Sequence, residues 1–175
     1  MERYLLICAF VFATAGSIED VRIRKIPNSL TYFGVIAALC IRLFMLGWPG
    51  LRDGLIGTLV GGGIFFFLFI VGGMGGGDVK LMAAVSAFAG VTQIVNLLIA
   101  AAIGGGAMAI AVMLYRQRVL TTIRNTIVLL QHHLTTGLRP HPDLNVRQTN
   151  SVRVPFAPAI AIGTLYCLTR TFSWG

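Results

Sequence analysis

The feature that most constrains this chain is a series of long apolar stretches, separated by short polar segments, that runs through nearly the whole sequence. Charged residues make up only 11% of it, against roughly 25% in an ordinary soluble protein. So few charges cannot cover the surface of a soluble monomer, which excludes that class. The apolar stretches cover residues 4–18, 30–46, 55–71, 79–89, 91–114 and 156–168. We therefore expect an all-α, polytopic membrane protein of about six transmembrane helices, forming one integral-membrane domain over residues 1–175.

The basic residues predict the orientation of these helices. Arg22, Arg24 and Lys25 follow the first stretch, and basic residues mark the cytoplasmic side of a membrane protein. If the chain breaks between residues 89 and 91, the segment 116–153 also returns to that side, and its six arginines come with it. Ten basic residues then lie inside and four outside, so we predict six spans with both termini outside.

The cytoplasmic segment between the fifth and sixth stretches has a helical pattern of its own. Apolar residues recur there at steps of three and four, which is typical of an amphipathic helix lying in the membrane interface. These residues are Leu120, Ile123, Ile127, Leu130 and Leu134. Gly137 and Pro140 end the pattern, and we expect a loop over residues 139–150.

Cysteine and histidine give no sign of a metal or redox site. Cys8, Cys40 and Cys167 stand singly inside apolar stretches, where we expect them to be small buried side chains. His132 and His133 are adjacent on the polar face of the predicted interfacial helix, where solvated histidines are common. We expect neither a metal nor a cofactor.

Only six acidic residues are available for chemistry, and ionisable groups at a membrane boundary are functional candidates because they are costly there. Glu2 and Asp53 fall in outer segments as single solvated acids, and Asp143 falls in a turn. Asp20 ends the first stretch and Asp78 begins the fourth, with Glu19 beside Asp20. Two spans separate Asp20 from Asp78, an even number, so both return to the cytoplasmic face.

Position alone does not choose between functional and structural roles for these two acids. Asp20 could pair with Arg22 or Arg24, and Asp78 could be the N-cap of a helix. The glycines over residues 72–77 favour function, because uncovered backbone lets another chain approach closely. The glycine triplets at 61–63 and 104–106 lie inside spans, where close helix packing explains them.

Three motifs together resemble one family over the whole chain. Residues 75–84 read Gly-Gly-Gly-Asp-Val-Lys-Leu-Met-Ala-Ala, which fits the GxGD signature of intramembrane aspartyl proteases and matches the second-aspartate motif of type IV prepilin peptidases. Residues 20–28 read Asp-Val-Arg-Ile-Arg-Lys-Ile-Pro-Asn and resemble the first-aspartate motif of that family. Residues 154–163 resemble its C-terminal Pro-aromatic motif, in the short form of tight-adherence (Flp) pilus peptidases.

The resemblance implies an enzyme that cleaves the leader of prepilins or pseudopilins at the cytoplasmic face of the bacterial inner membrane. Carried over, the catalytic pair is Asp20 and Asp78. The motif-supporting residues are Gly75, Gly77, Lys80, Pro27 and Asn28. Larger members carry a four-cysteine zinc-binding insertion and methylate the new N-terminus; no such insertion fits here, so we predict a peptidase without methyltransferase activity.

Some roles and partners stay open at this point. Lys80 could instead face lipid headgroups, while Pro27 and Asn28 are better explained as the start of the second helix. The expected partners are a prepilin and the lipid bilayer, and not nucleic acid, because a net charge of +8 in so apolar a chain indicates the inner membrane face.

Two other functions compete with leader cleavage. A small transporter, or a scaffold in a secretion assembly, could use the same acids and glycine-broken helices for ion binding or structure. An ion pathway should place its acids near the middle of the bilayer, whereas these acids lie at span ends, which favours hydrolysis. A GxGD protease that cuts other membrane proteins within their spans would differ only in its substrate.

Overall fold

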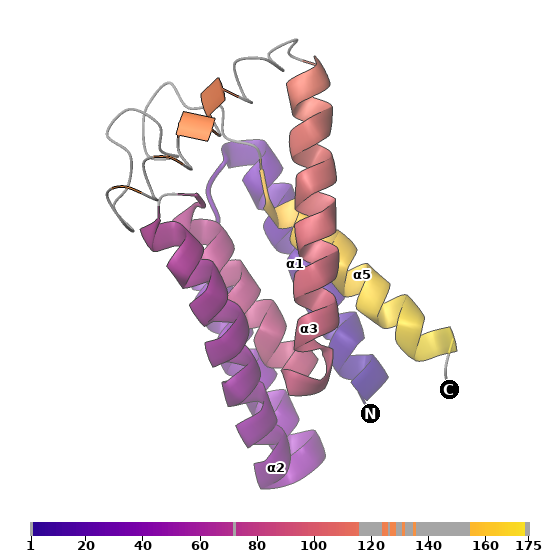
Figure 1. Cartoon of the computed structure of the whole chain (residues 1–175). Coiled ribbons are helices and arrows are strands. Elements are labelled where there is room, and N and C mark those ends of the chain that lie inside the picture. Colours follow the sequence, from indigo (N-terminus) through magenta and orange to yellow (C-terminus); the bar gives the residue numbers. More distant parts are fainter. Residues whose placement is uncertain are drawn as a thin grey trace.

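The structure is a computed structural model that describes residues 2–71, 73–115, 124–125, 127–128, 131, 135 and 155–173. These residues form helices and connecting segments, with no strand among them. The helices are α1 (Glu2–Ile23), α2 (Asn28–Ile70), α3 (Gly76–Tyr115) and α5 (Ala157–Ser173), shown in Figure 1. Three of them, α1, α2 and α3, are long and apolar enough to cross a membrane. The prediction of an all-α membrane protein is confirmed to this extent, and the number of six spans stays a prediction.

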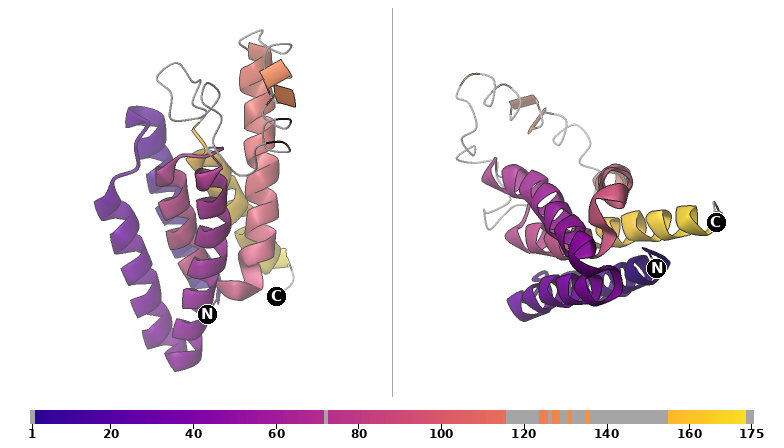
Figure 2. Two further views of the ribbon diagram at one scale, coloured as in Figure 1. Left: turned by 60° about the vertical axis from the view of Figure 1, so that its left-hand side comes forward. Right: turned by 90° about the horizontal axis from the view of Figure 1, so that it is seen from below.

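Both long helices turn back on themselves at a glycine. In α2 the reversal is at Gly47, with φ 67° and ψ −156°, two residues before Pro49. In α3 it is at Gly90, with φ 72° and ψ 179°, between the fourth and fifth predicted stretches. A positive φ with ψ near 180° is essentially restricted to glycine, which has no Cβ to clash. Each helix therefore supplies two antiparallel segments, and Figure 2 shows both reversals at the same end of the molecule as the ends labelled N and C.

The first segment of α3 forms the centre of the bundle. Nearly every residue from 81 to 90 is buried, and α3 packs against α1, α2 and α5, whereas α1 and α2 hardly touch. Small residues allow this close packing. A Cβ added at Gly62 would lie 2.9 Å from the Ala83 side chain, and one at Gly104 would lie 3.6 Å from Ala159. The packing explanation does not hold within the described part of the chain for Gly63 and Gly106, where an added Cβ would meet no described atom within 4 Å.

A buried ion pair ties the two reversals together, and the sequence prediction for its acid was wrong. Arg42 is only 3% exposed, and its Nη1 lies 2.6 Å from Asp53 Oδ2. Its Nη2 donates to the Phe88 carbonyl oxygen at 3.1 Å, while Asp53 Oδ1 accepts from the Val91 amide at 3.1 Å. Asp53 was expected to be an isolated solvated acid. It is instead the counter-charge that a guanidinium buried inside the bundle requires.

The cysteine prediction is right for one residue and wrong for another. Cys167 is buried, Cys8 is half-buried, and Cys40 is exposed on α2. An apolar stretch has both a packed side and a lipid-facing side, so its composition does not tell the two apart. The predicted interfacial helix over 120–134 and the loop over 139–150 lie, apart from isolated positions, outside the described residues.

Candidate active site

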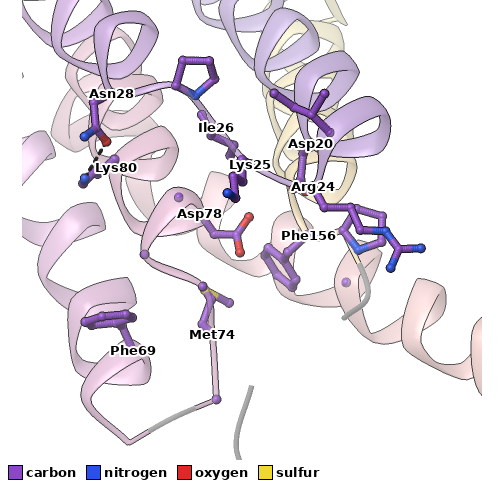
Figure 3. Close-up of a pocket in the computed structure, with 18 of the residues that line it drawn as sticks. Asp20, Arg24, Lys25, Ile26, Asn28, Phe69, Met74, Asp78, Lys80 and Phe156 are labelled. Carbon is purple, nitrogen blue, oxygen red and sulfur yellow. Dashed lines mark hydrogen bonds between the residues drawn. The ribbon is translucent and has the colours of Figure 1, made fainter. Parts of the chain in front are cut away.

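A cavity of about 980 Å³ is lined by residues at the end of the bundle opposite the two reversals. Its wall combines two carboxyl groups, three basic side chains, several glycines and a few apolar side chains, as drawn in Figure 3. These residues come from the end of α1, both ends of α2, both segments of α3, the connections between these helices and the segment before α5. The charged residues are Asp20, Arg24, Lys25, Asp78 and Lys80, and the apolar ones include Ile26, Phe69, Met74 and Phe156.

Asp20 reaches the cavity from the last turn of α1 and is half-buried. The helix ends three residues later because Arg24 takes a left-handed conformation, with φ 52°, and the chain then continues without regular secondary structure to Pro27. The Asp20 Oδ2 atom accepts a hydrogen bond from the backbone amide of Ala157 at 3.4 Å. A residue at the start of α5 therefore contacts a carboxyl group at the end of α1.

Asp78 enters the cavity from the first turn of α3 and is also half-buried. Its carboxylate accepts a hydrogen bond from the backbone N–H of Gly75. The helix begins at Gly76, so Asp78 is its third residue and not its N-cap, the structural role that the sequence left open. A third-position carboxylate that bonds back to the residue before the helix is one half of a capping box.

Two of the motif glycines allow close contacts at this point. A Cβ added at Gly75 would lie 3.1 Å from Asp78 Oδ2, which is tighter than an ordinary contact. A Cβ added at Gly77 would lie 3.3 Å from the Ile26 side chain, which is buried against this turn. These glycines let a carboxyl group and a packed isoleucine lie directly against the backbone of the turn.

The structure thus brings the two motif aspartates to one cavity, close enough for their charges to repel each other. Two neighbouring carboxylates do not both ionise cheaply, so such a pair holds one proton between its members. The ionised carboxylate can then take a proton from water while the protonated carboxyl group donates a hydrogen bond. Glu19, the neighbour of Asp20, is not among the residues that line the cavity.

The remaining motif residues join α2 to α3 beside this pair. Pro27 has φ −60° and ψ 136° and immediately precedes α2, so Pro27 and Asn28 do mark the start of that helix. The Lys80 ammonium donates to Asn28 Oδ1 at 2.7 Å and lies 5.8 Å from the centre of the Tyr32 ring. Lys80 is therefore held at the cavity wall by its contact with α2 (Figure 3). This contact does not decide between a role at the site and one at lipid headgroups.

Sequence reasoning did not single out three side chains of the wall. Lys25 was interpreted only as a topology signal, and Arg24 as a topology signal or a possible partner of Asp20, although both line the cavity. Phe156 was noted only as part of a motif; its ring packs at 5.7 Å on the ring of Phe65. Among the described residues no group of three or more His, Cys, Asp or Glu side chains is placed to hold a metal ion.

Comparison with known proteins places most of these residues within one matched region. A model of the type IV leader peptidase family matches residues 6–110, which include both aspartates and more than half of the chain. No curated protein and no solved structure matches the sequence. The match covers all of α2 and most of α1 and α3, and α1 and α3 are the helices that carry Asp20 and Asp78. The chain belongs to the type IV leader peptidase family.

Proposed function

We propose that this protein is an aspartyl endopeptidase that removes the leader from type IV prepilins or pseudopilins, with Asp20 and Asp78 as its catalytic pair. The observation that carries the proposal is the meeting of these two carboxyl groups at one cavity, although they come from helices far apart in the sequence. Both lie inside the region that matches the leader peptidase family. Neither a transporter nor a scaffold accounts for both the paired carboxyl groups and the match to the leader peptidase family.

The pair hydrolyses a peptide bond without a covalent intermediate. The ionised carboxylate takes a proton from a bound water, and the oxygen of that water attacks the scissile carbonyl carbon. At the same time the protonated carboxyl group donates to the carbonyl oxygen. The tetrahedral intermediate then collapses, the C–N bond breaks, and a carboxyl group delivers the proton that the leaving amine requires. Gly76 and Gly77, at the start of α3, place no side chain on the cavity wall, so an extended segment can bind there beside the pair.

We further propose that the substrate belongs to the short tight-adherence (Flp) class and that the new N-terminus is not methylated. The support is the short motif set of the sequence and its lack of a four-cysteine insertion. Co-expression with an Flp-type prepilin from the source organism tests both points. We expect a mature N-terminus directly before the apolar helix of the pilin, with the mass of an unmethylated amine. Cells without this protein are the control. A prepilin left uncut would remove the substrate assignment, and a methylated N-terminus would remove the peptidase-only assignment.

A topology experiment tests the proposed cytoplasmic position of the cavity. Ser29 is exposed in the first turn of α2, near the cavity, and Trp48 is 68% exposed at the reversal of α2. In a background with Cys8, Cys40 and Cys167 replaced by serine, we expect Trp48→Cys to react with a membrane-impermeant maleimide in intact cells. Ser29→Cys, which changes neither size nor charge appreciably, should react only after permeabilisation. The opposite pattern would place the cavity outside the cell, and labelling of both in intact cells would contradict the spanning arrangement.

A further inference from the structure

We propose that the first turn of α5 positions the Asp20 carboxyl group, through the backbone amide of Ala157 and the packing of Phe156. This inference rests on the proposed function, because it concerns how one member of the catalytic pair is held. It adds a positioning role for a segment that lies outside the residues matched by the family model. The contact that carries it is the hydrogen bond of 3.4 Å from the Ala157 amide to Asp20 Oδ2.

The Ala157 amide has few other possible partners. Ala157 is the first residue of α5, and the first four amides of a helix have no acceptor within that helix. Its side chain is 0% exposed, so this turn is packed against the bundle. A buried amide without an acceptor destabilises the fold, and Asp20 supplies the acceptor. Because the Ala157 amide can only donate, Asp20 Oδ2 acts as the acceptor and carries no proton toward it. This contact fixes the rotation of the Asp20 carboxyl group.

Phe156 fixes the position of that amide relative to α2 and to α3, the helix that carries Asp78. Its carbonyl accepts from the Ala159 amide at 2.9 Å, which forms the first turn of α5. Its ring packs edge-on against Phe65 of α2, with 5.7 Å between ring centres. The ring also covers Gly105 of α3 so closely that a Cβ added there would collide with it. One aromatic side chain thus connects the turn that contacts Asp20 to α2 and α3.

The amide acts on Asp20 without adding a charge. Among the residues that the structure describes, the ionisable groups at the cavity are Asp20, Arg24, Lys25, Asp78 and Lys80, which come from α1, the connection after it, and α3. Of the described residues before α5, Pro155 and Phe156 line the cavity, and neither of them titrates. A change in this turn should therefore alter the orientation of the carboxyl group and leave the set of charges that meets the substrate unchanged.

The decisive comparison is Ala157→Pro with Ala157→Val. Proline suits the first position of a helix, and Phe156 already has a non-helical conformation before it, so the backbone tolerates the change. Valine adds a similar volume and keeps the N–H, so it measures the cost of bulk alone. We expect the kcat of the proline variant to fall about ten- to a hundredfold below that of the valine variant, with KM within about twofold. Both constants are measured in proteoliposomes with the prepilin whose cleavage has been mapped.

The outcomes separate this inference from the proposed function. Equal kcat values for the two variants, or a change confined to KM, would overturn the positioning role. A wild-type protein that does not cut the prepilin, or an Asp78→Asn variant that does, would overturn the proposed function instead.

A second pair of variants keeps the test valid if the proline variant does not accumulate in membranes. Gly105→Ala should push the Phe156 ring and lower kcat, whereas Gly104→Ala, whose Cβ would make only ordinary contacts, should not. Adding Phe156→Leu to Gly105→Ala should restore part of the loss, because the smaller side chain makes room for the new methyl group. If the double variant is no faster than Gly105→Ala alone, Phe156 does not transmit the effect and the inference is wrong.

Discussion

Replacing either aspartate of the pair by asparagine is expected to abolish leader cleavage. Asp20→Asn and Asp78→Asn each remove a group that must gain or lose a proton during hydrolysis, so the rate should fall by at least about 10⁴-fold. Asparagine keeps the shape of the side chain, and its carbonyl oxygen can still accept from the Gly75 amide in Asp78→Asn and from the Ala157 amide in Asp20→Asn. Both variants should therefore reach the membrane in normal amounts. The measurement is the fraction of prepilin processed, divided by the amount of protein in the membrane.

Two controls make this result specific to the pair. Glu19→Gln removes the neighbouring acid, which does not line the cavity, and should retain most activity. The double variant Asp20→Asn/Asp78→Asn should be no slower than either single variant, because the two groups perform one function. If Asp78→Asn cleaves at a near wild-type rate, the capping role of Asp78 is its whole role. If it fails only because the protein is missing from the membrane, the aspartyl-peptidase proposal also loses its main support.

The second large effect is expected at the opposite end of the bundle, where Asp53→Ala should destabilise the fold by about 2–4 kcal/mol. The substitution leaves the Arg42 guanidinium without its counter-charge while the arginine side chain remains 4% exposed. The Asp53 carboxylate is 30% exposed, so its own loss of hydration is partial and the expected cost lies at the lower end for broken buried pairs. Thermal unfolding in detergent measures the change.

Neighbouring variants separate the loss of a partner from the loss of a charge. Arg52→Ala removes a charge from the adjacent, exposed residue and should leave the unfolding temperature nearly unchanged. Arg42→Met/Asp53→Ala removes both members of the pair and should be more stable than Asp53→Ala alone, because no unpaired guanidinium remains. Unfolding of Asp53→Ala at the temperature of Arg52→Ala would show that the ion pair does not hold the two reversals together.

The loss of stability in Asp53→Ala should leave the cleavage reaction at the cavity unaffected. Arg42 and Asp53 lie at the reversals of α2 and α3, whereas the cavity lies at the other end of the same helices. Among Asp53→Ala molecules that remain folded, we expect prepilin processing close to that of the wild type. The sequence alone would have predicted no effect at all for this residue, since it was interpreted as a single solvated acid.

The sequence by itself determined the class of the protein, the break in its third long helix and its candidate acids. Long apolar stretches with few charges leave a bilayer as the only suitable solvent. Glycine at position 90 marks the break because only glycine adopts its backbone angles without strain. The motifs around Asp20 and Asp78 indicated the family because they are local strings of residues, and local strings can be compared without a structure.

Only the tertiary structure decided which side chains meet across the bundle. The sequence places Arg42 and Asp53 in separate segments, and their pairing depends on where the two halves of α2 lie after the reversal. Whether Cys40 faces lipid or protein, and whether Gly63 or Gly106 packs closely, depends on the rotation of helices that are apolar on every side. The contact of Ala157 with Asp20 is made by a backbone amide, a group that every residue except proline carries. Since no side-chain pattern encodes that contact, it follows from the packing of α5 on the bundle alone.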